Sequence, residues 1–151
     1  AEAAGPGGMA GGQAIDIESI GKAMSLAELE HMHRLKTGAL IRASVLLAAL
    51  CRTDLPAARR AQLTRFAECA GHAFQVQDDI LDVEGELVRL GKMPGADEAR
   101  HKPTYPSIVG LEEAKRIARR LYDESLEALA DFGDDAEPLR WLSAYIIERD
   151  Y

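Results

Sequence analysis

Three aspartates close together in the sequence are the side chains best suited to do chemistry. They are Asp78, Asp79 and Asp82, in the stretch F-Q-V-Q-D-D-I-L-D. On a helix they share one face, with neighbouring Cβ atoms about 5–6 Å apart, and no Lys or Arg three or four residues away offsets their charge. Carboxylates gathered in this way suit a hard divalent cation. Mg²⁺ fits best, because it takes oxygen ligands and often shares its site with substrate phosphates.

The remainder of this helix indicates which way the aspartates face. Between Phe66 and Val83, at 100° per residue, the polar arc centred on Gln75 covers about a third of the circumference, and apart from Gln77 the residues outside it are apolar. Surface helices usually expose a wider polar face, so the narrow stripe predicts an internal polar cavity. A solvated acidic helix end is the alternative. The arc contains Glu68, Gly71, His72, Gln75, Asp78, Asp79 and Asp82.

Two lysines are candidates to bind an anion next to these aspartates. Lys36 interrupts the apolar stripe of an expected helix, so it either reaches out to solvent or faces a negative partner such as a phosphate. Lys102 lies in a Gly/Pro-rich segment after the aspartate helix, where it is placed to close over an anion. The stripe that Lys36 interrupts consists of Leu29, Met32, Leu40, Ala43, Leu47 and Leu50.

The elements that must position these residues are all helical, because no segment has the alternation of a strand. The whole chain, 1–151, is expected to be part of one all-α domain. Ser25 and Thr104 are predicted helix caps, and Gly110 a break. Residues 1–13 predict either a loop or a helix whose small residues permit close packing. Helices are expected over about 25–52, 56–83, 106–109, 111–132 and 138–151, with a loop over 85–106.

Composition narrows the class of protein. The 151 residues are 47% hydrophobic and carry a formal net charge of −7, which suits a globular domain and not a nucleic-acid binder. No apolar run approaches the ~20 residues of a membrane span. The two cysteines lack C-x-x-C spacing, so we expect buried free thiols and a cytoplasmic protein.

Five short motifs in a fixed order give the chain a family resemblance. They are G-G-Q-A-I-D (11–16), H-R-L-K-T-G-A-L (33–40), F-Q-V-Q-D-D-I-L-D (74–82), L-G-K-x-x-G-A-D (90–97) and K-x-T-Y-P (102–106). Together they resemble the C-terminal half of trans-prenyl diphosphate synthases, in particular bacterial farnesyl diphosphate synthases (geranyltranstransferases). The resemblance covers essentially the whole chain. It implies an isoprenoid synthase-type helical bundle around a central cavity, usually in a homodimer.

The resemblance also implies a reaction. An allylic diphosphate (dimethylallyl or geranyl) ionises, isopentenyl diphosphate attacks the cation, and a proton is lost to give farnesyl or a similar short-chain prenyl diphosphate. Asp78, Asp79 and Asp82 match the second of two aspartate-rich motifs, which together hold up to three Mg²⁺ ions on the allylic diphosphate. The implied reaction requires no side-chain nucleophile. His31 and His33 are two residues apart on a helix and cannot act together, and His72 and His101 are isolated, so we expect all four histidines to be structural or on the surface.

Further roles carry over position by position from the same resemblance. Lys36 and Lys102 match lysines that contact the allylic diphosphate, and Thr37 and Gln75 match groups beside the reacting allylic carbon. Phe74 matches a wall of the isopentenyl site. In addition, Gln13 and Asp16 are expected to line the cavity.

Two departures from the family pattern stand out. His101 replaces the glycine that usually precedes the loop lysine, and the family's first aspartate-rich motif is absent from these residues. We therefore expect a natural protein about twice as long and no turnover from the 151 residues alone. Two rival interpretations are a related class I terpene synthase and an inactive helical subunit or interaction module.

Overall fold

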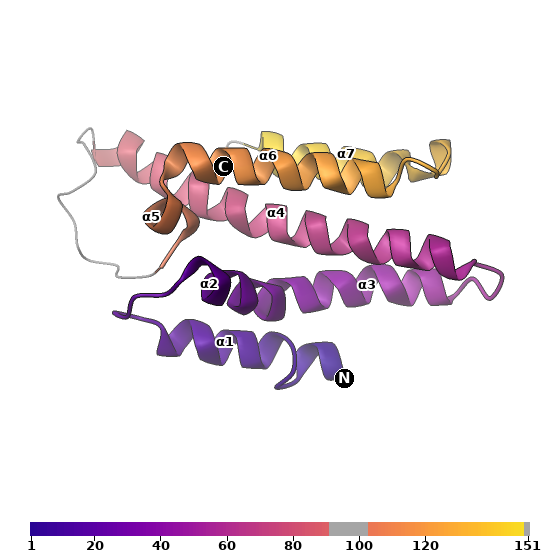
Figure 1. Ribbon diagram of the computed structural model, residues 1–151, viewed down its shortest axis with the longest axis horizontal. Coiled ribbons are helices and arrows are strands. Elements are labelled where there is room, and N and C mark those ends of the chain that lie inside the picture. The colour runs from indigo at the N-terminus through magenta and orange to yellow at the C-terminus, as the bar shows by residue number, and fades with distance from the viewer. Residues whose placement is uncertain (91–102, 150–151) are drawn as a thin grey trace.

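The chain folds into helices that run roughly along one long axis (Figure 1). The computed structural model describes residues 1–90 and 103–149, with the backbone alone for 86–90. These ranges contain helices and no strand, which confirms the all-α prediction. The helices are α1 (Met9–Glu18), α2 (Leu26–His33), α3 (Ala39–Leu50), α4 (Ala57–Leu90), α5 (Tyr105–Val109), α6 (Leu111–Ala128) and α7 (Glu137–Glu148). Shorter turns are η1 (Glu2–Ala4), the π-helical η2 (Arg34–Gly38) and η3 (Asp134–Ala136).

The aspartate helix α4 is the centre of the fold. It packs against α6 and α7, which lie above it in Figure 1, and against α3 and η2, which lie below it. Its apolar side is closed off from water, with Phe66, Val76 and Ile80 almost fully buried. Each such side chain contributes about 1.5–3 kcal/mol on burial, so this side fixes how α4 is rotated and where its polar arc points.

The predicted caps are confirmed. The Ser25 hydroxyl accepts a hydrogen bond from the Glu28 N–H, and the Glu28 carboxylate accepts one from the Ser25 N–H. Thr104 and Ser107 form the same reciprocal arrangement at the start of α5. Gly110 adopts φ 84°, a left-handed conformation that glycine takes readily, and it separates α5 from α6 as expected.

Several predicted helix bounds were wrong. The helix expected over 25–52 is α2, η2 and α3 in succession, and it ends at Leu50. The helix expected to stop at Glu84–Gly85 continues to Leu90, since one glycine costs a helix only about 1 kcal/mol. A 2.7 Å ion pair between Glu84 and Lys115 of α6 supports this extension. α6 ends at Ala128 instead of 132.

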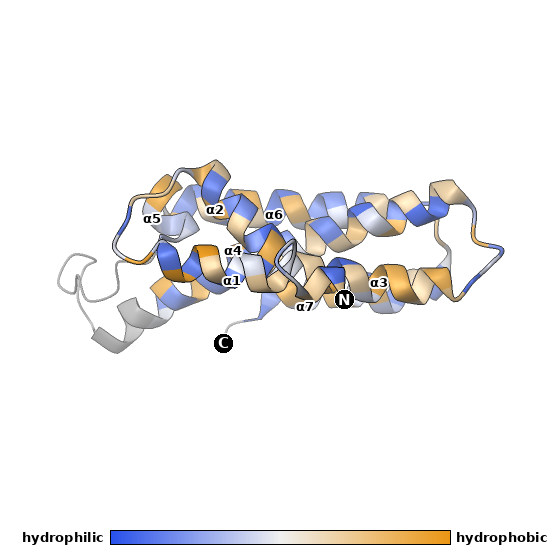
Figure 2. Cartoon of the chain, turned by 90° about the horizontal axis from the view of Figure 1, so that it is seen from below, coloured by the Kyte–Doolittle hydropathy of each residue, from blue (hydrophilic) through white to orange (hydrophobic). Residues whose placement is uncertain are grey.

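The surface also differs in part from expectation. Leu29 and Met32 of the apolar stripe are buried, whereas Leu47 is 66% exposed, and Figure 2 shows α3 as a largely apolar rod on the side facing the viewer.

Both thiols are free, but only Cys69 is buried. Cys51 is exposed because it follows the last residue of α3. No helix in the described ranges is long and apolar enough to cross a membrane.

Candidate functional site

The three aspartates of α4 differ in exposure. The Asp79 side chain is 14% exposed, that of Asp78 is 48% exposed, and Asp82 is exposed. Within the described residues, the exposure of the three carboxylates forms a gradient from a buried position to an open one. The gradient follows from helix geometry: neighbours in sequence are 100° apart, and the more buried Asp79 faces α5 and the end of α2.

Asp78 meets an arginine that the sequence analysis missed. Nη2 of Arg149, just beyond α7, lies 2.5 Å from Oδ1 of Asp78. The same guanidinium stacks 4.3 Å above the Phe74 ring and donates a hydrogen bond to the Phe74 carbonyl. Asp78 and Phe74 are thus brought together under one cation. No motif around Arg149 indicated this role, because only the packing of α7 against α4 places it there.

Asp79 has different partners. Its Oδ2 accepts a hydrogen bond of 2.9 Å from the backbone N–H of Tyr105, the first residue of α5. Nε2 of His33, the last residue of α2, lies 3.8 Å from the same oxygen. The Tyr105 ring stacks on His33, and its hydroxyl is hydrogen-bonded to Nε2 of His72. Tyr105 belongs to the K-x-T-Y-P motif, so a sequence signal for it existed.

Burial keeps His72 and the Tyr105 phenol uncharged at neutral pH. Burial is the main cause that lowers the pKa of His72. Glu30 opposes this shift in pKa, whereas nearby His33 and Arg34 add to it. Burial likewise raises the pKa of the Tyr105 phenol, assisted by the charges of Glu30 and Asp79. The hydroxyl–imidazole contact therefore joins two neutral groups.

Lys36 and Thr37 lie on the π-helical turn η2, a distortion that is often found at functional sites. Nζ of Lys36 is 2.5 Å from Oδ2 of Asp16 in α1, so the lysine does have a negative partner. That partner comes from α1 and not from the motif on α4. A Cβ on Gly12 would lie 2.2 Å from the Lys36 backbone nitrogen, so α1 reaches η2 only because residue 12 is glycine.

η2 also lies against α4, as the proposed site requires. A Cβ on Gly71 of α4 would be 3.6 Å from the Cα of Gly38, the last residue of η2. This approach sets the turn that carries Thr37 beside the helix that carries the buried Gln75. Gln13, by contrast, is exposed on α1. Lys102 and His101 lie outside the described residues.

The carboxylates of the aspartate motif are suited to bind a Mg²⁺ ion that is also bound by other groups. All three side chains of the motif offer carboxylate oxygens, the ligand type that Mg²⁺ takes. Within the described ranges, no three His, Cys, Asp or Glu side chains are grouped closely enough to hold a metal ion by themselves. Mg²⁺ is usually bound through one or two carboxylates together with waters and substrate phosphates, so an open arrangement suits it.

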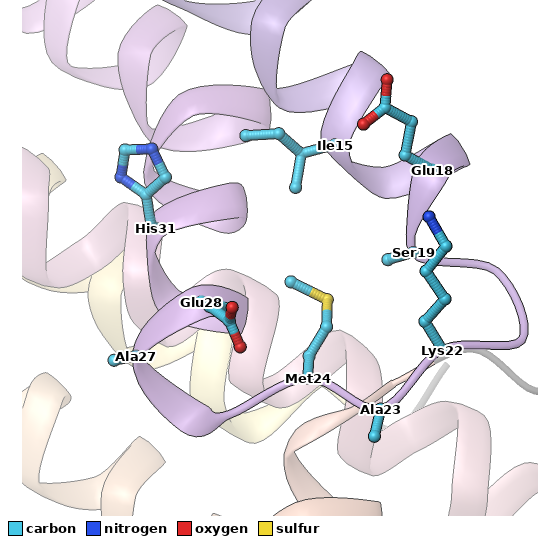
Figure 3. A pocket seen from close by; sticks show the side chains of 9 residues that line it. All are labelled: Ile15, Glu18, Ser19, Lys22, Ala23, Met24, Ala27, Glu28 and His31. Carbon is cyan, nitrogen blue, oxygen red and sulfur yellow. The ribbon is translucent and has the colours of Figure 1, made fainter.

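Two surface pockets lie away from the aspartate motif. One, of about 510 Å³, lies between α1 and α2. Ile15 and Met24 point into it, and Lys22 and Glu28 stand around it (Figure 3). The other, of about 430 Å³, is lined in part by His33 and His72. Neither is lined by any of the three aspartates, so the candidate site is a surface of α4 and its neighbours.

Comparison with known proteins gives a consistent result. The family model described as polyprenyl synthetase matches residues 5–137. The chain is 49% identical to farnesyl diphosphate synthase of Escherichia coli (strain K12) over 99% of its length, and 45% identical to that of Haemophilus influenzae over 99%. The chain spans about half the length of these relatives, 51% and 50% respectively.

Solved structures agree with the curated relatives. An FPP/GFPP synthase from Zymomonas mobilis matches 96% of the chain at 34% identity, with a TM-score of 0.81. A geranyltransferase from Helicobacter pylori, complexed with magnesium and isoprenyl diphosphate, matches 97% at 28% identity, with a TM-score of 0.74. The chain covers 47% and 48% of these two proteins.

Proposed function

This chain belongs to the polyprenyl synthetase family, and we propose that it is part of a Mg²⁺-dependent prenyltransferase. The reaction is the condensation of isopentenyl diphosphate with dimethylallyl or geranyl diphosphate to give farnesyl or a similar short-chain prenyl diphosphate. The 49% identity to a farnesyl diphosphate synthase over nearly the whole chain carries this proposal. That likeness does not favour a terpene synthase or an inactive interaction module.

The aspartate motif on α4 is the proposed metal-binding part of the site. When bound, Mg²⁺ offsets the negative charge that develops on the departing diphosphate. Asp78 is well suited to contribute, because its carboxylate is half-exposed and already binds a cation, Arg149. The choice of Mg²⁺ is supported by the Helicobacter relative, which was solved with magnesium and isoprenyl diphosphate. The number of ions, up to three, is part of the proposal.

Other residues act on the substrates. Lys36 and Lys102 neutralise the allylic diphosphate, and their positive charge stabilises it more strongly as the carbon–oxygen bond breaks. Thr37 and Gln75 stand beside the allylic carbon, and Phe74 forms a wall of the isopentenyl site. The adjacency of η2 and α4 supports the pairing of Thr37 with Gln75, because it places both elements along one surface.

The proposal extends to assembly and location. We place the enzyme in the cytoplasm as a homodimer whose domain includes residues 1–151. Sedimentation analysis of the full-length gene product measures its mass in solution, and a mass of one chain would contradict the dimer.

The test of function uses the full-length gene product with its Asp78→Asn variant. With isopentenyl and geranyl diphosphate and MgCl₂, we expect farnesyl diphosphate, no product in EDTA, and turnover reduced at least about 100-fold in the variant. Glu68→Gln is the matched control, because Glu68 is an exposed acid on the same helix outside the motif. Near-normal turnover of Asp78→Asn would contradict the metal role. Turnover by residues 1–151 alone would contradict the expectation that they are inactive.

A further inference from the structure

Two adjacent aspartates of the motif have opposite surroundings. Asp78 is half-exposed, and a single arginine side chain at its carboxylate could be replaced by another cation. Asp79 is mostly buried, and its carboxylate is directed at the backbone of a neighbouring helix. A carboxylate that already accepts a backbone hydrogen bond in a buried position is costly to redirect, because the N–H would lose its partner.

The partners of Asp79 belong to two elements besides α4. Tyr105 opens α5, and its N–H, one of the groups that a helix cannot satisfy internally, donates to Asp79. His33 closes α2 and lies just three residues before Lys36, at the point where the chain enters η2. Asp79 is therefore the point at which α2, α4 and α5 meet.

The packing around this junction is tight. Tyr105 is fully buried, and its ring lies nearly parallel to that of His33, with centroids 5.9 Å apart. His72 fixes the other end of Tyr105 through the hydroxyl. Neither ring nitrogen of buried His33 has a hydrogen-bond partner within the described part of the chain, and Oδ2 of Asp79, at 3.8 Å, is just beyond hydrogen-bond distance. His33 is thus held at the junction by the Tyr105 ring, and Tyr105 in turn is held to α4 by the Asp79 carboxylate.

We propose, as a refinement of the function proposed above, that Asp79 is a positioning residue and not a metal ligand. It ties the start of α5 to α4, and the Tyr105 ring held in this way packs against His33 at the end of α2, just before η2 with Lys36 and Thr37. In this proposal, Asp78 and Asp82, the two more exposed aspartates of the motif, bind the metal.

Conservative and truncating variants of the full-length gene product separate the two roles. Asparagine at position 79 can still accept the Tyr105 hydrogen bond through its amide oxygen, whereas alanine cannot. We expect Asp79→Ala to speed hydrogen exchange of the Tyr105 amide at least about tenfold, and Asp79→Asn to change it less than about threefold. We also expect Asp79→Asn to keep its Mn²⁺ affinity, measured by electron paramagnetic resonance, within about threefold of the parent, while Asp78→Asn weakens it at least about tenfold.

The two measurements have distinct outcomes. If Asp79→Asn weakens Mn²⁺ as much as Asp78→Asn does while the Tyr105 amide stays protected, Asp79 is a ligand and the proposal is overturned. Unchanged Tyr105 exchange in Asp79→Ala overturns it as well. If Mn²⁺ affinity is unaffected in Asp78→Asn, the metal role of the motif fails. The exchange of Tyr105 then still decides whether Asp79 is the anchor.

Discussion

Two cation–carboxylate pairs flank the candidate site, and their burial is reversed. In the pair between Lys36 and Asp16, the aspartate side chain is 5% exposed and the lysine side chain 28% exposed. In the pair between Arg149 and Asp78, the arginine side chain is 12% exposed and the aspartate side chain 48% exposed. Both have N···O distances of 2.5 Å, so distance alone does not distinguish them.

The reversal indicates different roles. A buried carboxylate depends strongly on its cation, because an ionised group in a low-dielectric setting is costly without a partner. Asp16 therefore holds α1 to η2. A half-exposed carboxylate is compensated by water as well, so Asp78 can exchange one cation for another at little cost to the fold. Asp16 thus depends on its cation for stability, whereas Asp78 is the carboxylate that can accept a new cation.

The largest expected effect lies on the structural side, at Gly12. A Cβ there would stand 2.2 Å from the Lys36 nitrogen and 2.5 Å from its Cα, and backbone cannot move aside as a flexible side chain does. We expect Gly12→Ala to lower the free energy of unfolding by about 3 kcal/mol or more, measured by urea denaturation. Gly7→Ala is the control, because its Cβ meets nothing within 4 Å. Equal stability of the two variants would show that α1 does not depend on this approach.

The next effect separates the two pairs directly. Replacing Lys36 by Met removes the cation facing a buried carboxylate, so we expect a loss of about 2 kcal/mol in the free energy of unfolding. Replacing Arg149 by Gln also removes the stacking on Phe74, but it leaves a carboxylate that is half in water, so it should cost about 1 kcal/mol, less than Lys36→Met. Chemical denaturation of both variants makes the measurement.

A double-mutant cycle and an exposed pair provide the controls for this comparison. Combining Lys36→Met with Asp16→Asn should recover part of the loss, because the charge left without Lys36 is then removed too. Arg42→Gln breaks the exposed pair with Glu68 and should have little effect. If Arg149→Gln proves more destabilising than Lys36→Met, the contrast between the pairs is wrong.

The smallest effect is a pH dependence from His72. Its pKa is lowered in the folded chain, chiefly by burial, so the folded state binds fewer protons than the unfolded state just below the ordinary histidine pKa of about 6.5. Stability is thus fully present above that value and declines as the pH falls through it. One group contributes a slope of at most about 1.4 kcal/mol per pH unit.

Denaturation at several pH values checks this expectation. His72→Gln should flatten the decline between pH 7 and 5, whereas Asp78→Asn, which changes the open pair, should leave it in place. A decline that persists in His72→Gln and disappears in Asp78→Asn would assign the pH response to the site and not to the packing beneath it.

Much of the fold followed from local signals. The Ser25 and Thr104 caps, the break at Gly110 and the buried side of α4 each depend on a few neighbouring residues, so the sequence predicted them correctly. The end of α4 was wrong because Gly85 was given more weight than the tertiary support from Lys115. The π-helical turn at Lys36 was missed for a similar reason, since no local pattern distinguishes it from an ordinary helix.

The site was predicted in part. The motifs pointed to Asp78, Asp79, Asp82, Lys36 and Gln75, whose roles stay predictions, and the structure places η2 against α4. Within the described residues the three aspartates differ in exposure, which the sequence did not predict, and Arg149 carried no sequence signal. Lys102 and its role remain a prediction, because the residue lies outside the described ranges.

The sequence by itself determined the helical class, the family and the shared face of the three aspartates, because periodicity, caps and motif order are written into short stretches of chain. Only the tertiary structure decided that Asp78 meets Arg149, Asp79 meets Tyr105 and Lys36 meets Asp16. Those partners are distant in sequence, and their meeting depends on how whole helices pack, which sets the burial and hence the electrostatic cost at each carboxylate.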